Sequence, residues 1–580
     1  MAASLHARFL GQVAREIEAL QASGDLPVGV DQTGLTVERP HDPAHGDLST
    51  NAAMVLSNRI GAHPRALAEK LAKRLAVMVE VAEVDVAGPG FINVRLTDQA
   101  WRDELAVIAE QKDRYGMSAA GAGKTVNIEF VSANPTGPMH MGHCRGAVVG
   151  DALASLLAFT GHRVIREYYV NDAGRQVDTL ARSAHHRYRE ALGERLGELP
   201  EGLYPGDYLK PVGEALAADY GGRYAHTPEP SWLAIFRKRT VAAMMETIRE
   251  DLSLLGISHD RFSSEAELVA AGKPDAAEAW LRERDLVYDG VLEPPKGEVP
   301  EDWVPIELPL FRSTRFGDDQ DRPLRKPDGS WTYFGVDLAY HFEKARDADE
   351  LIDIWGADHA GTVKRIVAAA DALTEGSKRF DVKLVQIVRL QRAGEPVKMS
   401  KRAGTFVTLA EVVREVGRDV VRFMMLTRKA EAQMDFDFAA AVEASKDNPV
   451  FYVQYAHARI CSLESRAADA GIAPDGAIDL SLLDGPDLVL VGHAAQFPRI
   501  VEAAAAAREP HRIAFFLEGL AAEFHSLWNI GNADPKRRFI CPEDPSVSRA
   551  RLFLAAAIGQ VIRNGLALMG VQPTYRMERA

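Results

Sequence analysis

The chain has 580 residues, 47% of them hydrophobic, and a formal net charge of −14 at pH 7. That length predicts three or four domains with large cores, and the acidity argues against a nucleic-acid binder with an overall basic surface, although it does not exclude local basic patches. The three cysteines, Cys144, Cys461 and Cys541, are scattered, so they predict neither a disulfide framework nor a CxxC metal pair and favour a reducing compartment.

The N-terminal segment lacks the pattern of a signal peptide. Its first 21 residues include Arg8, Arg15, Glu16 and Glu18 among apolar positions, so they hold no uninterrupted apolar core. No run of 18 apolar residues occurs elsewhere in the sequence. We therefore expect a cytoplasmic protein that has no membrane partner.

Residues 1–115 predict a small α+β module. Residues 81–96 predict two strands that turn at Gly88-Pro89-Gly90. Helical periodicity covers residues 1–25, about 50–59, and 64–77. By its own sequence this module indicates no function beyond that of a scaffold.

The stretch NIEFVSANPTGPMHMGHCRGAVVGD, from Asn127 to Asp151, predicts a strand, a tight loop and a helix. Residues 127–133 alternate as in a buried strand, and residues 134–138 break that strand. Small and apolar residues then recur at helical spacing from His140 onward. Such a unit begins a nucleotide-binding α/β fold, and its helix N-terminus offers N–H groups to an anion.

Two histidines occupy the start of this predicted helix. His140 and His143 are three residues apart, so both can lie on one face of the first turn, and Gly142 between them leaves room for a ligand. Two imidazoles can donate hydrogen bonds to phosphate oxygens without carrying a formal charge. An HxxH pair alone is equally compatible with solvated or metal-binding histidines.

Further strand–helix units follow and predict a doubly wound parallel sheet. Residues from about 180 to 305 mix helical and Pro/Gly-rich segments, so we interpret them as an insertion into this fold. Gly356 and Asp358 follow a predicted strand end, where they suit either ligand recognition or a turn with a helix cap. The predicted strands cover residues 163–170, 331–337, 349–355 and 382–390, and helices begin near residues 175 and 361.

A cationic run follows the last predicted strand. The segment VKMSKRAG, from Val397 to Gly404, holds three cations within five residues and ends in a glycine hinge. In isolation it is compatible with a solvated basic turn. Because it comes after a strand end, it is expected on the same side of the parallel sheet as His140.

The last part of the chain has purely helical periodicity. Thr408 and Glu411 form the pattern of a capping box, and apolar stripes recur over residues 439–463, 488–507, 513–528 and 549–569. These segments predict a helical bundle, which by itself could serve oligomerisation or scaffolding. Lys536-Arg537-Arg538 gives it a local basic cluster that can contact phosphate.

Two motifs carry a family resemblance. His140–His143, with its lead-in Ser132–Pro135, resembles the "HIGH" signature of class I aminoacyl-tRNA synthetases, and the lead-in is similar to that of the arginine enzyme. Lys398–Arg402 resembles the second signature of the class, KMSKR, and follows in the expected order. Further similarity to arginyl-tRNA synthetases lies in residues 45–53, 331–344, 356–361, 417–423 and 435–437.

The resemblance implies an α/β fold class with three domains. A class I synthetase-type, Rossmann-like parallel sheet is expected in a catalytic domain over residues 116–415, with the connective insertion at about 180–305. An additional α+β domain that contacts tRNA is expected over residues 1–115. An all-α anticodon-binding bundle is expected over residues 416–580.

The resemblance also assigns site residues. The catalytic residues it implies are His140, His143, Lys398 and Lys401. ATP is expected to contact these four residues and Gly142, Gly356, Met399 and Ser400. The arginine-binding residues it implies are Glu129, Asn134, Tyr333, Asp337 and Asp358, although many members have glutamine where this chain has Asp358. Tyr333 and Asp337 are expected on one face of a strand, because their offset of four is even.

The implied activity is the attachment of L-arginine to tRNA(Arg), with ATP as a substrate accompanied by Mg²⁺. No protein metal site and no structural zinc are expected, and we expect a monomer. The family also implies that arginine activation waits for bound tRNA.

Two other functions remain open from the sequence. One is a catalytically silent paralogue that binds tRNA as a regulator or scaffold, and the intact His140, His143, Lys398 and Lys401 argue against it. The other is a class I synthetase for a different amino acid. Glu129 and Asp337 favour a cationic substrate, but charge alone does not separate arginine from lysine.

Overall fold

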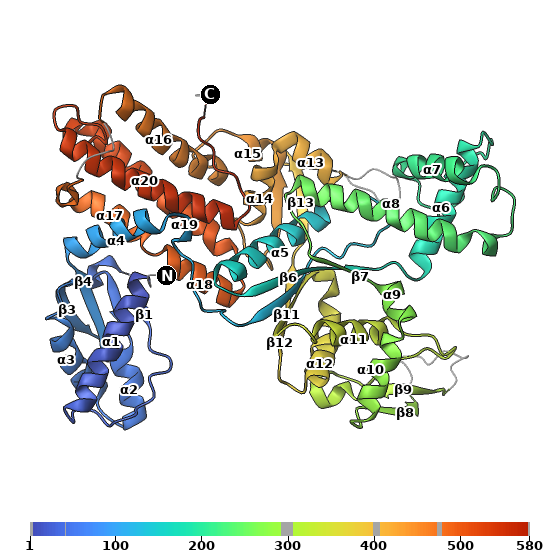
Figure 1. Cartoon of the computed structure of the whole chain (residues 1–580), viewed down its shortest axis with the longest axis horizontal. Helices are drawn as coiled ribbons and strands as arrows, with labels where there is room; N and C mark the ends of the chain where they lie inside the picture. Colours follow the sequence, from blue (N-terminus) through green and yellow to red (C-terminus); the bar gives the residue numbers. More distant parts are fainter. Residues whose placement is uncertain (1–3, 41, 292–304, 398–406, 473–477, 578–580) are drawn as a thin grey trace.

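The computed structural model describes residues 4–40, 42–291, 305–397, 407–472 and 478–577 of the chain. Its N-terminal module, at the lower left of Figure 1, is a four-stranded antiparallel sheet with three helices. The strand order is β1–β2–β4–β3, or Val37–Glu38, Leu48–Thr50, Phe91–Leu96 and Val81–Ala87. The helices are α1 (Leu5–Ala22), α2 (Ala52–Ile60) and α3 (Pro64–Leu75), as the sequence predicts to within a few residues.

The N-terminal module lies against the C-terminal bundle (Figure 1). Helix α4 (Asp98–Gln111), which begins at the capping residue Thr97, packs against α17 (Gly485–Ala494) and α20 (Pro545–Leu568). Glu38 of the module also pairs with Arg499 of the bundle at 3.5 Å. The first hundred residues are therefore fixed to the last hundred, far from their neighbours in sequence.

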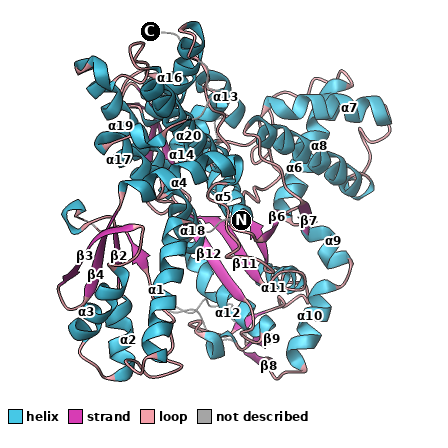
Figure 2. Cartoon of the chain, turned by 60° about the vertical axis from the view of Figure 1, so that its left-hand side comes forward, coloured by secondary structure: helices cyan, strands magenta, loops and turns pink. Residues whose placement is uncertain are grey.

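A five-stranded, all-parallel sheet forms the centre of the molecule (Figure 2). Its order is β12–β11–β5–β6–β7, so the direction of winding reverses between β5 and β11. The strands are β5 (Thr125–Glu129), β6 (Arg163–Val170), β7 (Arg261–Ser264), β11 (Glu350–Gly356) and β12 (Arg379–Val385). The helix predicted after the first strand is α5 (Met141–Phe159), and it packs against β5, β6 and β11. This sheet confirms the predicted Rossmann-like fold class.

The chain leaves this sheet in two excursions. The prediction of a single insertion at about residues 180–305 was therefore wrong in this respect. The first excursion is an arm of three helices with its own aromatic core around Tyr188, Trp232 and Phe236, at the upper right of Figure 1. Strand β7 then returns to the central sheet, where it pairs with β6. The arm consists of α6 (Arg175–Ala191), α7 (Lys210–Tyr220) and α8 (Leu233–Leu254).

The second excursion carries a small antiparallel sheet and leads to two helices. Its sheet order is β10–β9–β8. The elements are α9 (Glu265–Ala270), α10 (Lys273–Arg282), β8 (Val287–Val291), β9 (Glu307–Phe311), β10 (Arg322–Pro323), α11 (Tyr333–Lys344) and, after β11, α12 (Val363–Thr374). They share an apolar core that includes Phe311, Phe334 and Ile366.

Three strand predictions were wrong in part. Residues 331–337 are not a strand, because the hydroxyl of Thr332 accepts a hydrogen bond from the Gly335 N–H and caps helix α11. The strand predicted for 382–390 is divided into the end of β12 and the start of β13 (Val388–Arg392). The strand predicted for 127–133 ends at Glu129, because Val131 and Ser132 adopt positive φ angles of 73° and 39°.

The C-terminal region is a helical bundle preceded by a short strand pair. Strand β15 (Met434–Asp437) runs parallel to β13. The Thr408–Glu411 capping box opens α13 as predicted. The helices are α13 (Leu409–Val416), α14 (Arg418–Met425), α15 (Phe438–Val442), α16 (Pro449–Asp469), α17, α18 (Phe497–Ala507), α19 (His511–Ala533) and α20. The short strand β14 is Glu395–Pro396. The helix predicted for 439–463 is broken where Asn448 caps α16, and the one predicted for 488–507 is divided into α17 and α18.

In the described part of the chain, one helix, α20, is a candidate membrane span. By length and composition it could cross a membrane, but 72% of its apolar window is buried within the fold. Leu554, Ile558, Val561 and Leu566 are all fully buried. Helix α20 is thus the central helix of the bundle.

One arginine joins three distant segments. Arg422 of α14 is fully buried, and its guanidinium donates to the carbonyl of Met569 at 2.8 Å, to the carbonyl of Leu255 at 2.8 Å and to Asp151 Oδ2 at 2.6 Å. Leu255 ends α8, Met569 ends α20, and Asp151 lies in α5. The arm, the bundle and the first signature helix therefore meet at this side chain.

Candidate active site

The predicted site residues that the structure describes follow the strands on either side of the point where the winding of the parallel sheet reverses. Glu129 is the last residue of β5, and Gly356 is the last residue of β11, its neighbour in the sheet. Ligands of doubly wound folds bind in this crevice, beyond the carboxyl ends of the strands. The loop from β5 to α5 carries the two signature histidines into the same region.

His140 and His143 cap the helix that follows β5. The Gly142 N–H donates to His140 Nδ1 at 3.0 Å, and the His140 N–H donates to His143 Nδ1 at 3.4 Å. The two rings are stacked, with centroids 4.0 Å apart. Because each Nδ1 accepts a hydrogen bond from a backbone N–H, each neutral ring carries its proton on Nε2, and the Nε2 atom of His140 is buried within the fold. The phosphate-binding role of the two histidines stays a prediction.

Gly142 is required here for a reason other than the predicted one. A Cβ atom at this position would lie 2.7 Å from Cε1 and 2.9 Å from Nδ1 of His140. The glycine therefore makes room for the capping imidazole of His140, in addition to any ligand that approaches the exposed backbone.

The loop before His140 is held from two sides. The buried carboxylate of Asp251, in α8, accepts a hydrogen bond from the Met139 N–H at 2.8 Å. On the other side, the Leu409 N–H donates to the Met139 carbonyl at 2.9 Å, and Thr408 forms a β-bridge with His140. The chain that leaves the second signature thus returns to the first. Lys398, Met399, Ser400 and Lys401 themselves lie outside the described residues.

A buried ionic cluster lies where β5 and β11 pair, near their carboxyl ends. Lys344 Nζ lies 2.7 Å from Glu129 Oε2 and 2.6 Å from Asp353 Oδ1, and the other oxygen of Asp353 lies 2.9 Å from His341 Nε2. Glu129 Oε1 accepts a further hydrogen bond from the Ser132 hydroxyl at 2.8 Å. Glu129 and Asp353 are register partners on β5 and β11, so the two carboxylates lie side by side.

The pKa values in this cluster follow from burial and from the charges within it. Burial raises the pKa of Glu129, against the opposing effect of Lys344. Burial would also raise the pKa of Asp353, but the positive charges of Lys344 and His341 outweigh it and lower that pKa. Burial would lower the pKa of His341, but Asp353 raises it above its usual value.

Tyr333 and Asp337 share one face, although their element was wrongly predicted. On α11 they are four residues apart, which also places two side chains on one face of a helix. Tyr333 is 74% exposed. A Cβ atom placed on Gly174 would lie 3.9 Å from the Tyr333 hydroxyl. Asp337 is half-buried; it approaches His341 Nδ1 at 3.9 Å, and burial raises its pKa.

The other two predicted arginine-binding residues lie at the surface. The Asn134 amide donates to Gln176 Oε1 at 3.0 Å. Asp358 follows β11 and approaches His359 at 3.7 Å, with a side chain that is 75% exposed. A Cβ atom on Gly356 would lie 2.5 Å from Asp358 Oδ1, the end of an exposed side chain.

Sequence reasoning missed three residues of this cluster. Glu265 directly follows β7, and Tyr169 lies near the end of β6, with its ring 4.5 Å from that of Tyr340. Tyr169 and Glu265 both have pKa values raised first by burial and also by Asp337. Lys344 is the third. The spacing of Asp337, His341 and Lys344, four residues and then three, would have indicated one helical face.

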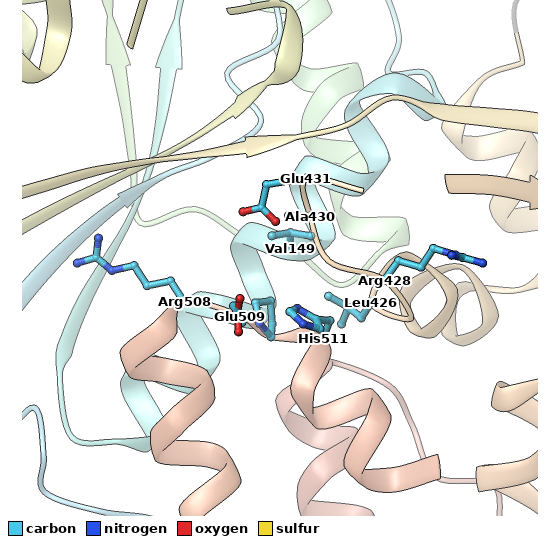
Figure 3. A pocket seen from close by; sticks show the side chains of 9 residues that line it. Val149, Leu426, Arg428, Ala430, Glu431, Arg508, Glu509 and His511 are labelled. Carbon is cyan, nitrogen blue, oxygen red and sulfur yellow. The ribbon is translucent and has the colours of Figure 1, made fainter. Parts of the chain in front are cut away.

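Two other features resemble sites. Glu129, His341 and Asp353 have ligand atoms within 4.8 Å of one another, but Lys344 Nζ already pairs with both carboxylates. A small surface crevice lies between α5, the segment after α14 and the α18–α19 connection (Figure 3). Val149, Glu431 and His511 are among its nine lining residues, none of which is a predicted site residue.

Comparisons with known proteins agree with this geometry. Residues 10–96 match the arginyl tRNA synthetase N terminal domain, residues 104–201 the class I (R) tRNA synthetase catalytic domain, and residues 453–577 the DALR anticodon binding domain. The chain is 66% identical over 578 residues to an arginine–tRNA ligase of Novosphingobium aromaticivorans, and the match covers 99% of each chain. The chain belongs to the arginyl-tRNA synthetase family.

Other arginyl-tRNA synthetases extend the comparison. An arginine–tRNA ligase of Cereibacter sphaeroides is 56% identical over 571 residues, which cover 97% of this chain and 98% of that one. The solved structure of Thermus thermophilus arginyl-tRNA synthetase is 21% identical, has a TM-score of 0.72 and covers 99% of this chain and 100% of its own, so the fold is shared. The predicted family and fold class are confirmed.

Proposed function

We propose that this chain attaches L-arginine to tRNA(Arg) in two steps. Arginine and ATP first form arginyl-adenylate and diphosphate, and the arginine is then transferred to the 3′-terminal ribose of the tRNA with release of AMP. The full-length match to an arginine–tRNA ligase at 66% identity carries this proposal. The class I catalytic domain match supports the same chemistry.

ATP is assigned to the crevice around the first signature. In this proposal, the Nε2–H groups of His140 and His143 donate to the phosphates and stabilise the charge that grows on the α-phosphate when the arginine carboxylate attacks it. Gly142 and Gly356 border the nucleotide. Lys398 and Lys401, with Met399 and Ser400, hold the β- and γ-phosphates as diphosphate leaves. Mg²⁺ accompanies ATP, and no structural zinc is proposed.

Arginine is assigned to the acidic side of the crevice. Its guanidinium is a permanent cation with five donors in a planar fork, so it needs carboxylates and a flat neighbouring face. Asp337 and Glu129 supply the carboxylates in this proposal, and Tyr333 supplies an aromatic face. Asn134 and Asp358 border the α-amino and carboxylate end of the substrate.

The tRNA is assigned to two outer domains and a groove. Residues 10–96, within the N-terminal module proposed for 1–115, and residues 453–577, within the bundle proposed for 416–580, match the arginyl tRNA synthetase N terminal domain and the DALR anticodon binding domain. A groove of about 860 Å³ between the segment after α14, β15, α16 and α19 is lined by the cations Arg428, Lys429 and Lys446 and by the carboxylates Asp435, Asp447 and Glu518. Lys536 and Arg538 are exposed, whereas Arg537 pairs with Asp484. Such cations can contact phosphates despite the acidic net charge.

The remaining parts of the proposal concern the state of the protein. We propose a monomer that acts in the cytoplasm and has no membrane partner, since the apolar helix α20 is largely buried. A silent, tRNA-binding paralogue is the alternative. Nothing in the comparisons favours it, and His140 and His143 retain a donor geometry that a silent protein would not need.

The test is ATP–diphosphate exchange with each of the twenty amino acids, with and without tRNA(Arg). We expect exchange with arginine only, and only when the tRNA is present. Exchange driven by lysine would overturn the substrate, and equal exchange without tRNA would overturn the tRNA dependence. Binding of tRNA without exchange for any amino acid would establish the silent paralogue.

A further inference from the structure

A lysine of the chain itself lies beneath the proposed arginine pocket. Lys344, at the end of α11, has a side chain that is 1% exposed, and its ammonium lies between Glu129 and Asp353 at 2.7 and 2.6 Å. The ring of Tyr340 lies beside it, with Nζ 4.7 Å from the ring centroid. Two carboxylates and an aromatic face form a complete site for an ammonium ion, and this chain fills it with its own side chain.

Lys344 limits how many further hydrogen bonds the carboxylates of Glu129 and Asp353 can accept from a ligand. Both oxygens of Asp353 are occupied, one by Lys344 and the other by His341. Both oxygens of Glu129 already accept one hydrogen bond, from Lys344 and from Ser132, so each has one further lone pair at most to offer. These contacts hold the Glu129 side chain in one orientation.

Asp337 differs from Glu129 and Asp353 in its partners and in its exposure. Among the described residues its ion-pair partner is His341, whose Nδ1 lies 3.9 Å from the Asp337 carboxylate and donates to the backbone carbonyl of Asp337 at 2.8 Å. The Asp337 side chain is also 38% exposed, whereas Glu129 and Asp353 are 7% and 0% exposed. Asp337 is therefore the carboxylate of this group that faces an incoming cation.

We propose that Lys344 is a positioning and specificity-determining residue of the arginine site. This inference rests on the proposed function. Lys344 fixes Glu129, neutralises the adjacent Asp353, and fills the ammonium site at the pocket floor, so that a substrate cation must bind above it, at Asp337. A guanidinium can bridge Asp337 and the remaining edge of Glu129 with its planar fork, whereas the compact ammonium of lysine cannot reach both in this way.

Removal of the Lys344 side chain provides the test. Lys344→Ala should raise the KM for arginine in the exchange assay by at least about tenfold, with the KM for ATP unchanged, because the two buried carboxylates lose their shared cation. The deleted atoms correspond to propylammonium. That amine, added at millimolar concentration, should restore at least a third of the wild-type kcat/KM for arginine, and tetramethylammonium at equal ionic strength should not.

A matched control comes from the neighbouring helix α10. Lys273→Met removes the partner of Glu343, which lies 2.8 Å from Lys273 on the outer side of α11, and it should leave the KM for arginine unchanged. Thermal melting separates folding from substrate effects. If Lys344→Ala does not fold, the charge-balanced double variant Lys344→Met/Asp353→Asn takes its place. It should show the same rise in the KM for arginine.

The outcomes distinguish this inference from the proposed function. Folded Lys344 variants with a wild-type KM for arginine, or with a loss that appears only in the KM for ATP, would overturn the role of Lys344. Absence of rescue by propylammonium in folded Lys344→Ala would also overturn it. Wild-type protein that shows no arginine-dependent exchange with tRNA(Arg) would instead overturn the proposed function.

Discussion

The tautomer of His140 and His143 determines which ring nitrogen can donate a hydrogen bond to a phosphate. With Nδ1 engaged by backbone N–H groups, each neutral ring carries its proton on Nε2 without needing a formal charge. In the proposed function these Nε2–H groups are the donors that are oriented before ATP binds. Orientation in advance is what makes such hydrogen bonds effective in a transition state, because no reorganisation is needed when charge develops.

We expect His143→Ala to lower kcat for adenylate formation by about 10²–10³-fold, since it removes one preorganised donor. ATP–diphosphate exchange measures this directly, and the KM for arginine should change little. His63→Ala, at an exposed position of the N-terminal module, is the control. Unchanged exchange in His143→Ala would contradict the assigned role.

Asp337→Asn should lower arginine-dependent exchange by at least about 10²-fold. Removal of the charged partner of a desolvated guanidinium costs about 3–5 kcal/mol, and each ~1.4 kcal/mol is tenfold in binding. The measurement is kcat/KM for arginine at saturating ATP and tRNA. Glu343→Gln, on the outer side of the same helix, controls for the loss of a negative charge, and a similar loss there would refute a specific role for Asp337.

At the scale of single residues, local patterns could be predicted from the sequence, but pairs of residues far apart in the chain could not. The HxxH spacing and the glycine between the histidines are contained within four residues, so their arrangement at a helix start could be predicted from the sequence. Lys344 pairs with Glu129 across 215 positions. No spacing rule indicates such a partner until the fold brings β5, β11 and α11 together.

At the level of elements, α11 shows how two periodicities can be confused. Trp331, Tyr333, Phe334 and Val336 are residues typical of strands, and they led to the wrong prediction. Thr332 decides the outcome through its hydrogen bond to the Gly335 N–H. The shared face of Tyr333 and Asp337 could still be predicted, because an offset of four keeps two side chains together in a strand and in a helix.

The link between α8 and the first signature leads to a prediction for an element outside the crevice. Asp251→Ala removes the acceptor of the Met139 N–H, and a hydrogen bond to a charged group contributes about 1.5–3 kcal/mol. We expect kcat for exchange to fall about tenfold or more, with Asp251→Asn closer to wild type because it keeps an acceptor oxygen. Glu250→Ala, the exposed neighbour, is the control. Equal activity of all three variants would show that the loop holds its position without α8.

For the whole molecule, the order of the domains could be predicted from the order of the motifs, but their contacts could not. The N-terminal module meets the bundle through residues such as Glu38 and Arg499, which carry no recognisable pattern. Two histidines lie in this region. Burial lowers the pKa of His6 to about 4, with Arg499 and Arg39 adding to the effect, and burial and Arg39 lower the pKa of His493 to about 4.

Acid should therefore weaken the attachment of the N-terminal module. Between pH 6.5 and pH 4 the unfolded chain binds protons that the folded chain does not, so stability falls as the pH is lowered through this range, by up to about 1.4 kcal/mol per pH unit for each histidine. We expect the melting temperature to fall over this range and His493→Gln to reduce the slope. A slope that is the same in His6→Gln/His493→Gln as in the wild type would contradict this assignment.

The junction at Arg422 has a consequence for how the folded protein opens. The Arg422 guanidinium donates hydrogen bonds to carbonyls at the ends of α8 and α20 and to Asp151 of α5. None of these three helix segments can therefore lose its contact with Arg422 without disturbing the other two. Amide hydrogens near Leu255, Met569 and Asp151 should consequently exchange with solvent deuterium through a common opening event. Native-state exchange followed by mass spectrometry should find one shared opening free energy for these segments, and Arg422→Met should separate them into independent units. If the end of α8 exchanges much faster than α5 in the unaltered protein, the arm opens alone and the junction does not couple it to the signature helix.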